Sequence, residues 1–122
     1  MLRPVVTDWT ATGSIWMHTG WTTQFAYIGG SQLNSSYPLA GWPDLVFVNG
    51  VSLTCAHAPN VTGGQGSVGP GTFYIDYTNQ AIYMGNNPNG ATVEVAQYQN
   101  GLSVHDGCQV LGLGFSQYYV GK

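Results

Sequence analysis

LVFVNGVSLT, residues 45–54, is the stretch of this sequence that most clearly indicates a fold class. Two runs rich in β-branched and aromatic residues flank the dipeptide Asn49-Gly50. Asn-Gly between such runs is the strongest short signal for a β-hairpin, because both residues tolerate the positive φ angles of a type I′ turn. The stretch therefore predicts two antiparallel strands, with a simple chain bend as the alternative.

More strands are expected on the C-terminal side of this hairpin. The run TFYIDY, residues 72–77, alternates like a strand that places Phe73, Ile75 and Tyr77 on one face. Turns at 78–80 and 86–90 then separate strands at 81–84 and 91–96. Because 18 glycines and 6 prolines interrupt the chain, a long amphipathic helix is not expected. The pattern predicts an all-β sandwich, barrel or β-helix.

The 122 residues have room for one domain with one core. We divide this domain, residues 1–122, into three parts. Residues 1–43 form a Trp-rich segment of irregular strands and loops, 44–98 form antiparallel hairpins, and 99–122 form short straight segments joined by tight corners. The alternation of Gly112 and Gly114 leaves little side chain on one face, which suits stacking between the coils of a solenoid.

The scarcity of charge excludes several classes of partner. Charged residues make up 6% of the chain, and Arg3 and Lys122 are its only fixed cations. Nucleic-acid binding needs Lys and Arg to neutralise phosphates, and so does binding to anionic membranes. No apolar run reaches the length of a membrane span, so no membrane insertion is expected. Solubility from uncharged polar residues is typical of secreted proteins, which predicts an extracellular or cell-surface location.

Cys55 and Cys108 are the two cysteines. Two thiols without a CxxC motif do not complete a structural zinc site. In an oxidising compartment they would form one disulfide, which closes a loop of about 54 residues and stabilises the fold by about 4 kcal/mol. The alternative is a pair of buried free thiols.

Aromatic residues concentrated in the N-terminal third suggest a sugar-stacking platform. A pyranose ring presents a face of C–H groups that packs on an aromatic face, while neighbouring polar side chains bond its hydroxyls. The alternative is a core cluster, because Trp is highly buried on average. The candidate ligand-binding residues are Trp9, Trp16, His18, Trp21, Tyr27 and Trp42, with Tyr37 nearby.

Catalytic and metal-binding signals are weak. Asp76 and Glu94 would form an acid pair for glycoside hydrolysis if they lay on neighbouring strands. Their alternative roles are stabilising the 78–80 turn, for Asp76, and facing solvent, for Glu94. The histidines, His18, His57 and His105, have no metal-ligand spacing, so no metal site is expected. No cofactor is expected either, since no nucleophile elbow or phosphate-binding glycine motif occurs.

Several segments carry a resemblance to a known family: DLVFVNGV at 44–51, GTFYIDY at 71–77, IYMGNNP at 82–88, VEV at 93–95 and VLGLGF at 110–115. They resemble bacterial secreted right-handed parallel β-helix proteins, in which a small β-domain of this pattern precedes or interrupts the first coils. The resemblance implies an all-β fold: a compact antiparallel domain, sandwich or small barrel, leading into a first β-helix rung. Known catalytic acids of that family lie on later coils, which this sequence lacks.

These observations together predict an extracellular glycan-associated binding module of a β-helix type protein, with a polysaccharide as its partner. Enzymatic activity stays undecided, and its absence is favoured. One alternative is a self-assembling structural protein, because a rung with no following coil would expose an edge and form a homo-oligomer through residues 108–120. The second alternative is a small glycan-active hydrolase.

Overall fold

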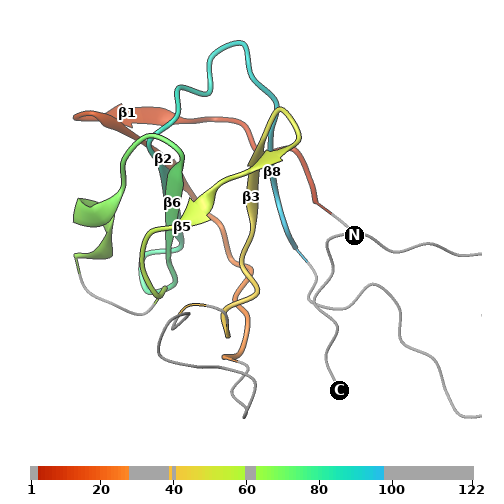
Figure 1. The fold of residues 1–122 in the computed structure, drawn as a ribbon, viewed down its shortest axis with the longest axis vertical. Helices are drawn as coiled ribbons and strands as arrows, with labels where there is room; N and C mark the ends of the chain where they lie inside the picture. Colours follow the sequence, from red (N-terminus) through yellow and green to blue (C-terminus); the bar gives the residue numbers. More distant parts are fainter. Residues whose placement is uncertain (1–2, 28–38, 40, 60–62, 98–122) are drawn as a thin grey trace, which may run out of the picture.

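A computed structural model describes residues 3–27, 39, 41–59 and 63–97 of the chain. In these residues it contains eight short strands and one 3₁₀ helix, η1 (Gly64–Ser67), and no α-helix (Figure 1). The prediction of an all-β domain is confirmed. No helix in this part of the chain has the length and apolarity of a membrane span.

The strands form two sheets that are antiparallel apart from one pair. The larger sheet has the order β1-β2-β7-β6-β5, and the smaller has the order β4-β3-β8. The larger sheet consists of β1 (Thr10–Thr12), β2 (Ile15–Thr19), β7 (Ala81–Met84), β6 (Thr72–Asp76) and β5 (Thr54–Cys55). The smaller sheet consists of β4 (Val51–Ser52), β3 (Val46–Val48) and β8 (Val93–Val95).

The hairpin expected at Asn49-Gly50 is present between β3 and β4. Val48 pairs with Val51, and the two loop residues have φ angles of 51° and 81°, as a type I′ turn requires. The second strand is shorter than predicted, because the chain leaves the smaller sheet at buried Leu53. The next residues form β5, which pairs with β6 in parallel. This crossover links the two sheets.

A second two-residue hairpin lies in the segment that was expected to be irregular. Thr12 pairs with Ile15 across Gly13-Ser14, and Gly13 has a φ of 63°. A positive φ at the first loop position is what a type II′ turn needs, and glycine adopts it without strain. Strand β2 then pairs with β7, so the N-terminal segment is part of the larger sheet.

Both sheets contribute to one hydrophobic core. Phe73, Ile75 and Tyr77 lie in it together, as their alternation predicts, alongside residues of β3, β7 and β8. The opposite face of β6 is also covered, since Tyr74 is only 1% exposed. Its ring lies so close to Gly64 that a Cβ there would be 2.5 Å from it. The 3₁₀ helix η1 therefore packs on Tyr74, which is why this strand is buried on both faces.

The proposed β-helix rung lies in residues 99–122, outside the described part of the chain. Two mostly antiparallel sheets around a shared core are what the structure shows for the rest.

Candidate functional site

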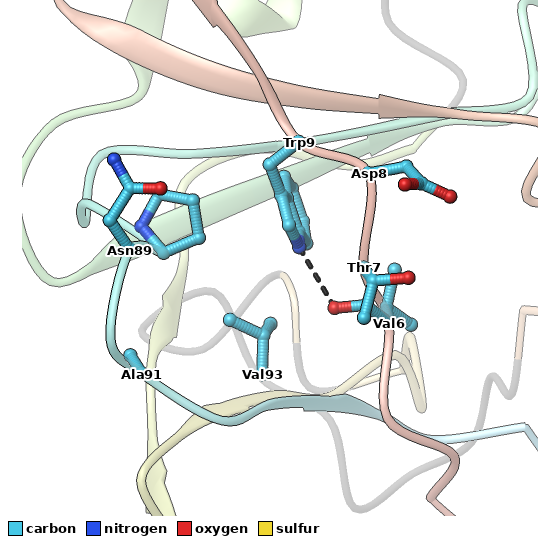
Figure 2. Close-up of a pocket in the computed structure, with 8 residues that line it drawn as sticks. Val6, Thr7, Asp8, Trp9, Asn89, Ala91 and Val93 are labelled. Carbon is cyan, nitrogen blue, oxygen red and sulfur yellow. Dashed lines mark hydrogen bonds between the residues drawn. The ribbon is translucent and has the colours of Figure 1, made fainter.

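A hollow of about 290 Å³ opens between the segment before β1 and the segment before β8 (Figure 2). We call it the Trp9 hollow, because the indole ring of Trp9 forms one of its walls. Its eight lining residues come from two parts of the chain that are distant in sequence: Val6, Thr7, Asp8, Trp9, Pro88, Asn89, Ala91 and Val93.

Backbone bonds hold the N-terminal wall in place. The Val6 N–H donates to the carbonyl of Val93 at 2.8 Å, which ties this segment to β8. Asp8 then has a φ of 64°, a left-handed conformation that is uncommon for a residue other than glycine. The turn at Asp8 directs Trp9 back over the chain, where its Nε1–H donates to the Val6 carbonyl at 3.0 Å. The polar edge of the indole is therefore paired within the protein.

His18 of β2 supports the same wall. Its Nδ1 lies 2.7 Å from the Thr7 carbonyl oxygen. A carbonyl oxygen only accepts, so Nδ1 carries the proton in this bond. The imidazole ring also contacts the indole of Trp9, with ring centroids 5.6 Å apart at 50°. His18 thus ties Thr7 to β2 and limits the movement of Trp9.

The opposite wall is a turn rich in Asn, Pro and Gly. The Asn89 N–H donates to Oδ1 of Asn87 at 2.9 Å, and the Ala91 N–H donates to the Pro88 carbonyl at 3.0 Å. These bonds shape the turn, whose Asn89 side chain lies across the hollow from Trp9 (Figure 2), and Pro88 also lines the hollow. Within the described residues, the Asn89 amide makes no side-chain hydrogen bond, so its donor and acceptor are available to a ligand.

A second aromatic group lies around Tyr77, which we call the Asp44 cluster: Phe25, Tyr27, Trp42, Asp44 and Tyr77. The ring of Tyr27 is 5.2 Å from that of Trp42, which meets Tyr77 edge-on at 6.1 Å. The Tyr77 hydroxyl donates to Oδ2 of Asp44 at 2.7 Å and accepts the Phe25 N–H at 3.1 Å. These contacts hold the segment that follows β2 against Tyr77, directly after the end of β6.

The carboxyl group of Asp44 is buried in this cluster. Asp44 is 5% exposed, and its Oδ1 is buried without a hydrogen-bond partner in the described part of the chain. Burial raises the pKa of Asp44 to about 6, although the bond from Tyr77 acts in the opposite direction. Burial also raises the pKa of Tyr77. Burying this carboxyl with one oxygen unpaired costs free energy, which the rest of the core must offset.

The predicted ligand-binding residues do not form one platform. The structure brings Trp9 to His18 and Tyr27 to Trp42, as two separate contact groups. Trp16 is half-buried against the core. Trp21 belongs to the core, and its 9% exposure leaves little surface for a ligand. Tyr37 lies outside the described residues.

Sequence reasoning missed Asp8, Pro88 and Asn89 as neighbours of Trp9. The one local signal for that wall is the run Asn86-Asn87-Pro88-Asn89-Gly90, which was identified as a turn but not as part of a site. Asp44 was also missed, because nothing in the sequence around it distinguishes a buried carboxylate from an exposed one.

Asp76 and Glu94, the weak catalytic candidates, belong to different sheets and so are not on neighbouring strands. Asp76 accepts from the backbone N–H and the side-chain amide of Asn79, at 3.1 and 2.7 Å, which holds the turn between β6 and β7. Glu94 forms an ion pair with Arg3 at 3.3 Å. Each carboxylate therefore has a structural partner, and a catalytic role for either stays a prediction.

Cys55 is a free thiol in this structure, and no disulfide is seen in the described residues. Its Sγ–H donates to the His57 carbonyl at 3.2 Å, and burial raises its pKa to about 11. Cys108, its predicted partner, lies outside the described residues, as does His105. No group of three or more His, Cys, Asp or Glu side chains suited to a metal ion occurs in the part that the structure describes.

Comparison with known proteins identifies no relative of this chain. No protein-family model matches the chain, and neither a curated protein nor a solved structure matches it. The site must therefore be interpreted from its own residues.

Proposed function

We propose that this chain is an extracellular glycan-binding module and that the Trp9 hollow is its binding site. The observation that carries the proposal is the arrangement of Trp9 opposite Asn89 (Figure 2), in a hollow that Pro88 also lines. An aromatic wall, a proline ring and an unpaired amide face a common space.

The chemistry of each wall matches one side of a sugar ring. The face of an indole carries partial negative charge, and the C–H groups on one face of a pyranose carry partial positive charge, so the two attract each other as they stack. Because the Nε1–H of Trp9 is bonded to Val6, the ring offers a ligand its face and not its polar edge. The Asn89 amide supplies one donor group and one acceptor for hydroxyls.

Preorganisation also supports binding at this site. Trp9 is held by its bond to Val6 and by contact with His18, so little side-chain freedom is lost when a ligand packs on it. A mobile aromatic side chain would lose more conformational entropy on binding. The hollow therefore has the rigid walls that a weak stacking interaction needs.

The proposal extends to the parts of the protein that the described residues do not cover. We propose that residues 99–122 begin a right-handed parallel β-helix, for which the likeness of VLGLGF at 110–115 is the support. An extracellular location is proposed because the chain combines 6% charged residues with many uncharged polar ones. Self-association through residues 108–120 concerns residues outside the described part and stays a prediction.

The test is binding of the 122-residue chain to a panel of neutral polysaccharides: cellulose, chitin, mannan, xylan and β-1,4-galactan. We expect measurable retention on at least one polymer and its loss in Trp9→Ala. Trp9→Leu keeps an apolar side chain but removes the aromatic face, so it should lose binding as well. Trp16→Ala is the matched control, because Trp16 is also half-buried against the core but does not line the hollow.

Each variant must be shown to fold by circular dichroism before its binding is compared. Retention on no polymer, or equal retention by folded Trp9→Ala and the wild type, would remove the Trp9 hollow as a glycan site.

A further inference from the structure

The charge around the Trp9 hollow restricts the sugars that it accepts. Of its eight lining residues, only Asp8 carries a charge at neutral pH. In Figure 2 the Asp8 carboxylate lies on the far side of Trp9 from Asn89 and points away from the space between them, so its charge acts on a ligand only at a distance. It makes no hydrogen bond or ion pair with the described residues, so its negative charge is not neutralised locally.

Cations that would offset this charge are scarce in the whole sequence. Arg3 and Lys122 are the only Lys and Arg residues. Arg3 forms an ion pair with Glu94 at 3.3 Å, and its guanidinium lies 4.3 Å from the centre of the Phe47 ring. Lys122 lies outside the described residues. Recognition of a carboxylate in proteins generally uses an Arg fork or a Lys ammonium, and the lining supplies neither.

The volume of the hollow bears on the length of the ligand. About 290 Å³ is at the lower end of the range for ligand pockets, which is roughly 300–1,000 Å³. One Trp9 face likewise stacks with one ring. Both features suit the capture of a single sugar residue, with the rest of a polymer extending into solvent.

Building on the proposed function, we infer that the Trp9 hollow selects one uncharged sugar residue and discriminates against uronic acids. The uncharged ring stacks on Trp9 and bonds Asn89. A carboxylate at the same place would have no cation among the lining residues to pair with, and the Asp8 charge on the far side of Trp9 would add a weaker repulsion.

The test uses the neutral polymers of the panel whose sugars carry a C6 primary alcohol, which xylan lacks, and compares each polymer before and after one chemical change. Selective oxidation of the primary alcohol at C6 converts cellulose, mannan or β-1,4-galactan into the corresponding uronate without altering the backbone. Affinity electrophoresis of the full chain then measures retardation by both forms at low and high salt. For two charges about 10 Å apart in water, Coulomb repulsion predicts about twofold weaker retardation by the oxidised form at low salt. High salt should reduce the difference by screening.

Asp8→Asn isolates the contribution of the Asp8 charge. Asn tolerates a left-handed backbone, so the variant should fold. Asp76→Asn is the matched control, because it removes the same net charge from the β6–β7 turn. We expect Asp8→Asn to reduce the difference in retardation between the neutral and the oxidised polymer. Asp76→Asn should leave that difference unchanged.

The outcomes separate this inference from the function on which it rests. Equal or stronger retardation of the wild type by the oxidised polymers would overturn the inference while leaving glycan binding intact. So would an identical effect of Asp8→Asn and Asp76→Asn. Failure to bind any neutral polymer would overturn the proposed function and this inference together.

Discussion

The Trp9 hollow and the Asp44 cluster both place aromatic rings beside an aspartate. They differ in whether their polar groups are hydrogen-bonded and whether they are exposed to solvent. At the hollow, the indole N–H is paired with Val6 and Asp8 is exposed. In the cluster, the carboxyl of Asp44 is buried and Oδ1 has no partner in the described residues. The two regions contain similar residue types, but the exposed Trp9 hollow is suited to a ligand, whereas the buried Asp44 cluster stabilises the fold.

The largest expected effect on the free energy of unfolding comes from comparing Trp21, which is in the core, with Trp9, which lines the hollow. Trp21→Ala should lower the free energy of unfolding by about 3–5 kcal/mol, because it empties a buried site in the core. Trp9→Ala should lower it by about 1–2 kcal/mol, because Trp9 is half-buried. Urea denaturation followed by circular dichroism measures both, and equal losses would contradict the division into two regions.

Next in size is the effect of removing the hydroxyl that bridges the cluster. Tyr77→Phe leaves the Asp44 carboxyl and the Phe25 N–H without their bonds. We expect a loss of about 2–4 kcal/mol at neutral pH, since unpaired buried polar groups are costly. The control is Tyr83→Phe, which removes a hydroxyl from a half-buried tyrosine of β7 and should cost far less. Comparable losses for the two variants would show that the bridge does not stabilise the cluster.

The Asp44 carboxyl should also give stability a distinct pH dependence. Between about pH 4 and 6 the unfolded carboxyl is ionised whereas the folded one, with a pKa of about 6, keeps its proton. The folded state then binds more protons, so the contribution of this group to stability falls as pH rises through that window. At about 1.4 kcal/mol per pKa unit, the loss is about 2–3 kcal/mol.

Asp44→Asn removes that titration and keeps an oxygen to accept from Tyr77. Its free energy of unfolding should exceed that of the wild type above pH 6, because the neutral amide avoids burying a charge. We expect a gain of about 1–2 kcal/mol, smaller than the full cost of the charge, because the new N–H₂ group lacks a partner. Below pH 4 the advantage should disappear. Parallel urea curves from pH 3.5 to 7.5 measure the difference, and a constant offset across that range would show that Asp44 does not titrate there.

Local sequence signals were sufficient to predict the Asn49-Gly50 hairpin but not to locate the candidate site. Asn49-Gly50 predicts its turn because two adjacent residues determine the φ angles, and the Phe73–Tyr77 face follows from alternation. Pairing of β8 with β3, and the crossover at Leu53, depend on contacts between distant parts of the chain. Trp9 and Trp21 have similar sequence surroundings, so only tertiary packing shows that Trp21 is in the core and Trp9 lines a hollow.

The smallest effect concerns His18, which supports the hollow without forming part of its lining. His18→Ala removes the bond to Thr7 and the ring contact with Trp9, so it should cost about 1 kcal/mol of stability. The freed indole would then lose more conformational freedom on binding, which we expect to weaken glycan binding about fivefold.

His18→Asn tests whether the bond or the ring is responsible. An Asn amide can place an N–H donor close to the position of the histidine Nδ1, so it restores the bond to Thr7 but not the contact with Trp9. Recovery of stability with binding still weak would assign the positioning of Trp9 to the imidazole ring. Recovery of both would assign it to the Thr7 bond alone. If His18→Ala binds as tightly as the wild type, the wall is rigid without His18, and the bond from Trp9 to Val6 is sufficient to hold the indole in place.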